Sequence, residues 1–293
     1  MTNSYHPPLP TATEIAQRLG LHRAGRGWRG DCPICQYKQS LALDVRDGRP
    51  LLWCASCQDS AGLATVLRQA AGGGVLPSPR PARLPRLDRA DAAARLERAR
   101  AIWDGAEEIE ADTPAGKYLE MRRIAHVASS HALRWRRDTP HPSGGRRIAL
   151  LARIDAPDGK FSGLQRVFLK PDGSKADIEP AKASIGVIAG GACRLQPARL
   201  ELVIGEGIES SAAAGAILGL PAWSAISCGN LGRSLALPEA IRAVVIAVDR
   251  DEPGQAAARE AWRRWKSEGK QVRFATPKQA GADFNDLAQE GVR

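Results

Sequence analysis

Three acidic residues in the last third of the sequence stand at the ends of apolar runs. Glu206 follows LELVIG, and Asp249 and Asp251 follow AVVIAV in the text AVDRD. The carboxyl ends of strands in an open α/β sheet converge on the ligand crevice, so we expect these side chains to meet there. Mg²⁺ or Mn²⁺ suits them, because hard cations prefer carboxylates, water and substrate phosphates. This set predicts a metal-dependent site for phosphoryl transfer.

A further acidic cluster, Asp283 and Asp286, lies in GADFNDLAQ at the start of an expected last helix. N-capping is the alternative role for Asp286, because Asp caps helices well. For the three strand-end acids, the alternative is a set of solvated turns.

Cysteine spacing indicates a second metal site, near the other end of the chain. Two C-x2-C pairs are separated by 18 residues: Cys32, Cys35, Cys54 and Cys57. Four thiolates complete a closed tetrahedral site for one structural Zn²⁺, and the strand–turn–strand text LALDVRDGRPLLWC would bring the pairs together. Four reduced, buried cysteines are the alternative. Cys193 and Cys228 stand alone and are expected to be small buried hydrophobic residues.

Positive charge is concentrated in the middle of the chain, whose net charge is +10. Residues 121–154 contain eight arginines and one acid, Asp138. A polyanion is the natural partner, because Arg makes bidentate phosphate contacts and counterion release drives binding. We therefore expect Arg134, Arg136 and Arg137 to contact nucleic acid. A solvated basic surface is the alternative.

The elements that must position these residues fall into distinct segments. Residues 72–90 are too rich in Pro and Gly for a helix or a central strand, which predicts a linker after a zinc-ribbon DNA-binding domain at residues 1–71. Residues 91–199 begin with a helical pattern and continue with a hairpin, giving a basic α+β subdomain. Residues 200–293 alternate strands and helices, which predicts an α/β domain with a mainly parallel sheet. The expected fold class is therefore α/β and α+β multidomain.

The motifs VIGEGIES and AVDRD, placed after a cysteine ribbon, resemble the Rossmann-like Toprim domain of DnaG-type primases and of the primases of phages and mobile elements. The text from GDCPICQYKQS to LLWCASCQDSAGLATVL is similar to the zinc-binding module of phage primase-helicases. GKFSGLQRVFL and DGSKADIEPAKASIG are similar to the basic strand and turn region ahead of Toprim in the primase catalytic core.

The resemblance implies roles for matching residues. Glu206 would be the Toprim glutamate, Asp249 and Asp251 the metal-binding pair, and Asp283 the acid that closes the site. The residues that would hold template, nucleotide or primer are Arg166, Lys175 and Lys182. There are two departures: Ser210 stands where replicative primases tend to carry a further acid, and Asn285 stands where they have Asp. The number of catalytic metals therefore stays open.

The implied activity is that of a DNA primase, a nucleotidyltransferase that makes short RNA primers on single-stranded DNA from nucleoside triphosphates. The sequence has no G-x-x-x-x-G-K-[ST] loop, so a replicative helicase would be a separate partner, as expected for a phage or mobile-element enzyme. The alternatives are a Toprim-type nuclease and a non-catalytic single-stranded-DNA-binding protein.

No apolar run approaches the ~20 residues that a membrane-spanning helix needs. The first ten residues, MTNSYHPPLP, lack the basic and apolar parts of a signal peptide. Together these features predict a cytoplasmic protein with no membrane partner.

Overall fold

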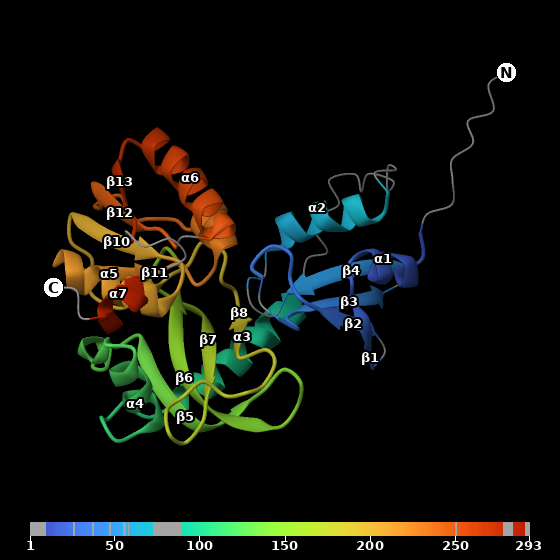
Figure 1. The fold of residues 1–293 in the computed structure, drawn as a ribbon, viewed down its shortest axis with the longest axis horizontal. Helices are drawn as coiled ribbons and strands as arrows, with labels where there is room; N and C mark the ends of the chain where they lie inside the picture. The colour runs from blue at the N-terminus through green and yellow to red at the C-terminus, as the bar shows by residue number, and fades with distance from the viewer. Residues whose placement is uncertain are drawn as a thin grey trace.

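The computed structural model contains three sheets and the helices that cover them (Figure 1). It describes residues 10–25, 27–36, 38–46, 48–54, 57, 59–72, 89–249, 251–277 and 284–290. Most of the expected linker, residues 72–90, and Asp283 lie outside these ranges. Across the part of the chain that is described, no helix is long and apolar enough to cross a membrane.

The N-terminal ribbon is an antiparallel sheet with a helix on either side of it in the chain. Its strands, in sheet order, are β1 (His22–Ala24), β2 (Gly27–Gly30), β3 (Leu41–Arg46) and β4 (Arg49–Cys54). Helix α1 (Ala12–Arg18) starts at a capping box between Thr11 and Glu14, and α2 (Ser60–Ala70) follows the second cysteine pair. The register pairs Leu41 with Cys54, which confirms the expected hairpin between the cysteine pairs.

The middle of the chain forms a second antiparallel sheet. Its strands are β5 (Leu133–Pro140), β6 (Arg146–Asp155), β7 (Phe161–Leu169) and β8 (Lys182–Gly186), in that order. Helix α3 (Arg89–Asp104) packs on this sheet through Ile102 and Trp103, whereas α4 (Pro114–Met121) and the short η1 (Ala125–Val127) precede β5. The β6–β7 hairpin confirms the prediction from IALLARID and GLQRVFL.

The C-terminal sheet is parallel except at one edge. Its order is β13 (Gln271–Ala275), β12 (Ala243–Ala247), β10 (Glu201–Gly205), β11 (Ala222–Ser224) and β9 (Cys193–Arg194), and β9 alone is antiparallel to its neighbour. The strands are connected by α5 (Ile208–Leu218), the π-helical turn η2 (Asn230–Ser234) and α6 (Glu252–Ser267), and α7 (Phe284–Glu290) follows β13. The expected alternation and the mainly parallel sheet are both confirmed.

One hydrophobic core joins the middle and C-terminal sheets. Leu119 of α4, Leu150 of β6 and Val167 of β7 belong to the same buried cluster as Val203 of β10 and Val245 of β12. The ribbon has a separate core. Because apolar burial is the main stabilising contribution to folding, the two larger sheets stabilise each other as one unit.

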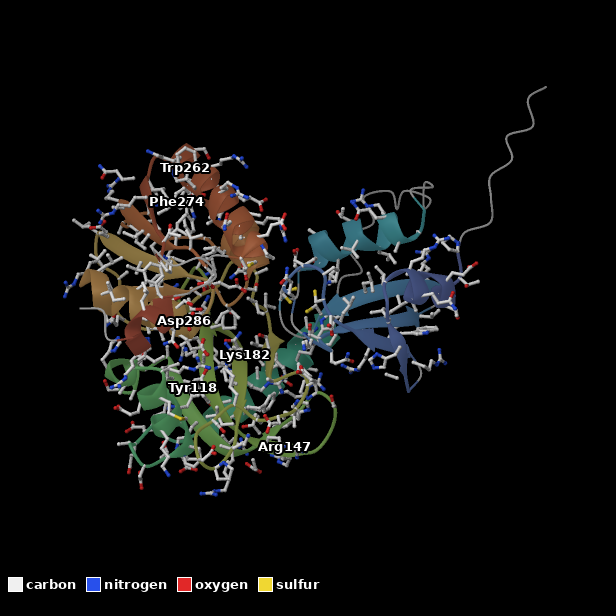
Figure 2. The ribbon with its side chains drawn as sticks, viewed as in Figure 1. Tyr118, Arg147, Lys182, Trp262, Phe274 and Asp286 are labelled. Carbon is white, nitrogen blue, oxygen red and sulfur yellow. The ribbon has the colours of Figure 1, made fainter. Side chains whose placement is uncertain are left out.

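A buried polar network crosses the boundary between these two sheets. Glu209, in the first turn of α5, accepts a hydrogen bond from the Tyr118 hydroxyl and contacts Lys182 Nζ at 3.0 Å. Figure 2 shows Tyr118 and Lys182 in the part of the molecule built around the middle sheet. Burial alone would raise the pKa of Glu209, but the positive charges of Lys182 and Lys175 and the hydrogen bond from Tyr118 together outweigh burial, and the pKa lies below its usual range. The network therefore ties α4, β8 and α5 together.

Replacing Glu209 with Gln should destabilise the protein by about 3–5 kcal/mol at pH 7, because Lys182 loses the counter-ion that it contacts. A carboxyl whose pKa is lowered by folding contributes stability above its unfolded value, 4.5, and loses it as the pH falls. The difference in free energy of unfolding between the wild type and Glu209→Gln should therefore become smaller below that pH. Urea unfolding at several pH values checks this, with the exposed Glu120→Gln as the control. An equal loss of stability in Glu209→Gln at every pH would contradict the explanation that the charge of Glu209 stabilises the fold.

Candidate functional site

The four paired cysteines come together in the ribbon. Cys32 and Cys57 place their sulfurs 3.9 Å apart, and Cys35 and Cys54 place theirs 3.7 Å apart. A tetrahedral ion with Zn–S bonds of about 2.3 Å requires sulfurs about 3.8 Å apart, so the spacing fits one structural zinc ion. Among the described residues, this is the group whose ligand atoms all lie within 4.8 Å of one another.

Contacts within the cluster favour a thiolate at Cys54. Hydrogen bonds from Cys32, and then from Cys35 and Cys57, lower the pKa of Cys54. The backbone N–H of Cys57 also donates to Cys54 Sγ at 3.4 Å, and the Ser40 hydroxyl lies 3.3 Å from it. These contacts fix the ligand that ends strand β4.

The three predicted acids gather at one edge of the parallel sheet. Glu206 directly follows β10, and Asp249 and Asp251 follow β12, the neighbouring parallel strand. Asp251 also caps α6, because its Oδ1 accepts a hydrogen bond from Gly254 N at 2.7 Å. A side chain at Gly254 would lie 2.7 Å from that oxygen, so this turn requires glycine. The acids share one edge of the sheet, but their carboxylates form no group within 4.8 Å of one another.

Glu206 lies in an environment that disfavours its negative charge. Burial is the main cause that raises the pKa of Glu206, and the charge of Asp251 raises it further. Cys228 opposes this shift by donating a hydrogen bond from its thiol to Glu206 Oε2 at 2.7 Å. A bound cation would relieve the same strain, so the donor set fits a hard divalent metal such as Mg²⁺ or Mn²⁺.

Cys228 is surrounded by the acidic residues. Burial raises the pKa of Cys228, and Glu206, Asp251 and Asp249 raise it further. Cys228 and Cys193 are both buried, as expected, but Cys228 is also a polar member of the site. Its hydrogen bond spans 22 residues of chain, so local sequence pattern gave no signal for it.

Two of the three expected template- or nucleotide-binding residues are buried within the protein. Arg166 donates to the carbonyls of Pro140 at 2.7 Å and Ala183 at 3.3 Å, and burial lowers the pKa of Arg166 to about 10. Lys182 contacts Glu209, and its positive charge also lowers the pKa of Glu206. The structure therefore places Lys182 near the acidic edge, with its position fixed by Glu209.

The arginine cluster in β5 makes contacts within the protein. Arg136 donates to the carbonyls of Ala101 and Ile102 near the end of α3, at 3.2 and 3.4 Å. Arg134 lies over the Trp103 ring, 4.8 Å from its centre. Two of the three side chains thus support the end of α3, a favourable place for positive charge. Arg137 is exposed and remains the most accessible of the three predicted DNA contacts.

Asn285 and Ser210, the two departures from the primase pattern, lie in the folded interior. Asn285 Nδ2 donates to the carbonyl of Arg122 at 2.5 Å, and Arg122 donates back to Asn285 Oδ1 at 3.3 Å. This pair joins α7 to the end of α4. Ser210 is buried in α5.

The ribbon contacts the Toprim-like part of the chain close to the acidic residues. Asp59, the cap of α2, forms an ion pair with Arg233 of η2. The Ser227 hydroxyl donates to the carbonyl of Cys57 at 3.5 Å. Figure 1 shows α2 beside the end of α6. The zinc site and the acidic site are therefore linked by short contacts.

Cys54→Ser should abolish zinc binding and unfold the ribbon, because structural zinc supplies folding free energy directly. Elemental analysis should find one zinc per chain in the wild type, and Cys193→Ala, a substitution outside the quartet, should retain it. A metal-free wild-type protein with a folded ribbon would refute the assignment.

Glu206→Gln should stabilise the metal-free protein at neutral pH. Folding raises the pKa of this carboxyl, so the ionised form costs stability as the pH rises through the folded value. We expect melting about 2–4 °C higher, which corresponds to roughly 1 kcal/mol in a chain of this size. In chelator, the rise in melting temperature of Glu206→Gln over the wild type should grow from pH 5 to pH 8. The same difference should shrink when Mg²⁺ is added. Equal melting temperatures of the wild type and Glu206→Gln at every pH would mean that the ionised Glu206 carboxylate does not destabilise the protein.

Two family models match parts of the chain. A Toprim domain family matches residues 201–293, and a family described as a domain of unknown function matches residues 93–195. No curated protein matches the chain in sequence.

Solved structures of primases are similar to this chain at low sequence identity. The zinc-binding and RNA polymerase domains of the Aquifex aeolicus primase show 15% identity and a TM-score of 0.48, over 94% of this chain and 80% of that one. A DnaG primase catalytic domain bound to single-stranded DNA shows 15% identity and a TM-score of 0.47, over 69% and 78%. The primase fragment of the bacteriophage T7 primase-helicase shows 12% identity and a TM-score of 0.42, over 57% of this chain and 66% of that one. From its sequence and its mainly parallel sheet, the C-terminal part of the chain, residues 201–293, is a Toprim domain.

Proposed function

We propose that this protein is a DNA primase, which joins ribonucleotides into short primers on single-stranded DNA by two-metal nucleotidyl transfer. The observation that supports this best is a Toprim domain with Glu206, Asp249 and Asp251 at adjacent strand ends, in contact with a cysteine ribbon. A ribbon of this kind commonly contacts nucleic acid, and the acidic edge suits a metal-bound triphosphate.

Each residue of the site would have a distinct role. When bound, divalent ions would stabilise the attacking 3′ oxygen and the leaving pyrophosphate. Asp249 and Asp251 would hold those ions, with Asp283 as a further acid. Glu206 would be a metal ligand and would accept the proton of the attacking hydroxyl, a task suited to a carboxyl with a raised pKa. Lys182 would place positive charge beside the nucleotide phosphates.

Template and nucleotide would approach over the basic middle subdomain. Lys175 and Arg137 are the candidates for contacts with the template, the nucleotide or the growing primer, whereas the buried Arg166 guanidinium would support the strand beneath them through the carbonyls of Pro140 and Ala183. The net charge of +10 favours binding of a polyanion. A separate replicative helicase would open the duplex, as in the systems of phages and mobile elements.

The strongest competing function is that of a Toprim nuclease, because the same acids can cleave a phosphodiester as readily as form one. The other is single-strand binding without catalysis. Incubation of labelled single-stranded template with ribonucleoside triphosphates and Mg²⁺ or Mn²⁺ separates the three functions. New RNA products support the primase, and shortened template supports the nuclease. An unchanged template without any RNA product supports a binding protein.

Asp249→Asn and Glu206→Gln should each reduce primer synthesis by about 100-fold or more, because both remove charge that stabilises the transition state through bound metal. Folding and single-strand binding should be retained. The measurement is primer synthesis across Mg²⁺ and Mn²⁺ titrations, with the exposed Asp112→Asn as a matched control. Wild-type rates in both site variants would place the active site elsewhere and end the primase proposal.

A further inference from the structure

Residues 227–233, which we call the bridging segment, contact both metal sites. On one side, Cys228 donates its thiol hydrogen to Glu206 Oε2 at 2.7 Å. On the other side, the Ser227 hydroxyl donates to the carbonyl of the zinc-site residue Cys57 at 3.5 Å. Adjacent residues of one segment therefore hold a predicted catalytic acid and the cysteine ribbon.

The contact with the ribbon is closely fitted. The ion pair between Asp59 and Arg233 brings together a carboxylate that is 6% exposed and a guanidinium that is 37% exposed. Asp59 also caps α2 through a hydrogen bond from Gly62 N at 3.0 Å, so its direction is fixed by the ribbon. A Cβ at Gly229 would lie 2.9 Å from Asp59 Oδ2 and 3.0 Å from Asp59 Cβ. Because Gly229 has no side chain, Asp59 of the ribbon can lie directly against it.

The bridging segment is firmly held on the Toprim domain. Arg264 of α6 donates to the carbonyls of Leu231, Gly232 and Leu235, at 3.1, 3.2 and 2.7 Å. Asn230 Nδ2 donates to the carbonyls of Ala225 and Gly191, both at 2.8 Å. Because the turn is fixed along its length, the position of Arg233 and that of Cys228 are mechanically linked.

We propose that the ribbon, docked through Asp59 and Arg233, positions the Glu206 carboxylate by way of Cys228. Arg233 and Cys228 are then positioning residues, which act through Glu206 and touch neither substrate nor metal. The proposal rests on the proposed function only in taking Glu206 as a ligand of the divalent metal. It goes beyond that function by giving the ribbon a role at the Toprim acids that is independent of DNA.

The first experiment measures Mn²⁺ binding to the full-length, zinc-loaded protein by electron paramagnetic resonance, with no nucleotide or DNA present. Cys228→Ala removes the donor to Glu206 and should weaken Mn²⁺ binding about 10-fold, as loss of a residue that orients a metal ligand commonly does. Cys228→Ser keeps a donor and should restore most of the affinity. If packing alone mattered, Ser would be no better than Ala in this buried place.

The second experiment is a double-mutant cycle across the dock. Asp59→Asn keeps a good cap for α2 but removes the charge, and Arg233→Gln removes the opposite charge. Each should weaken Mn²⁺ binding by several-fold, and the double variant should be no weaker than either single variant, because the pair acts as one unit. Arg242→Gln, which removes an exposed arginine of the same domain, is the matched control and should bind Mn²⁺ normally.

Unchanged Mn²⁺ affinity in Cys228→Ala would overturn the proposal at its first link. Unchanged affinity in Asp59→Asn and Arg233→Gln would overturn it at the ribbon. Glu206→Gln reports on the proposed function separately, because normal Mn²⁺ binding in that variant would show that Glu206 is no metal ligand. Loss of binding in Glu206→Gln together with normal binding in the other variants would leave the primase proposal standing and end this one.

Discussion

Two glutamates three residues apart in VIGEGIES experience opposite electrostatic environments, and the arrangement around the sheet edge depends on this difference. Lys182 and Tyr118 compensate the charge of Glu209, so the pKa of Glu209 is lowered although the residue is buried. Glu206 is half-buried beside other acids, and its pKa is raised. Environments that drive the pKa values of two carboxyls apart in this way distinguish a structural acid from a reactive one. Glu209 stabilises the interface between the sheets, whereas Glu206 favours a bound cation.

The surrounding architecture keeps this contrast in place. Glu209 lies in the first turn of α5, on the C-terminal sheet, whereas Lys182 begins β8 and Tyr118 lies in α4. The groups that compensate its charge therefore come from the neighbouring middle part of the chain. The shared hydrophobic core holds those elements together. The unfavourable charge of Glu206 is tolerated because the shared core is apolar and well buried and Glu209 is bonded to both Tyr118 and Lys182.

The sequence predicted features that depend on local pattern. Apolar runs located β10 and β12, and the C-x2-C spacing located the sulfur cluster. Contacts between distant segments were not predictable in this way. Strand β5 was missed because its apolar positions alternate with arginines, which suggested a charged surface although two of them support the end of α3. The roles of Glu209 and Cys228 depend on partners 91 and 22 residues away, for which no periodicity gives a signal.

The common core of the middle and C-terminal sheets also limits how such a protein can evolve. The two family matches end and begin within this region of the chain, at residues 195 and 201, yet the segments bury their apolar faces against each other. Separation by recombination would expose both faces, so the pair must be inherited as one unit. The ribbon has its own core and meets the rest through a few polar contacts. Exchange of modules between lineages would therefore be tolerated before residue 89 and selected against near residue 200.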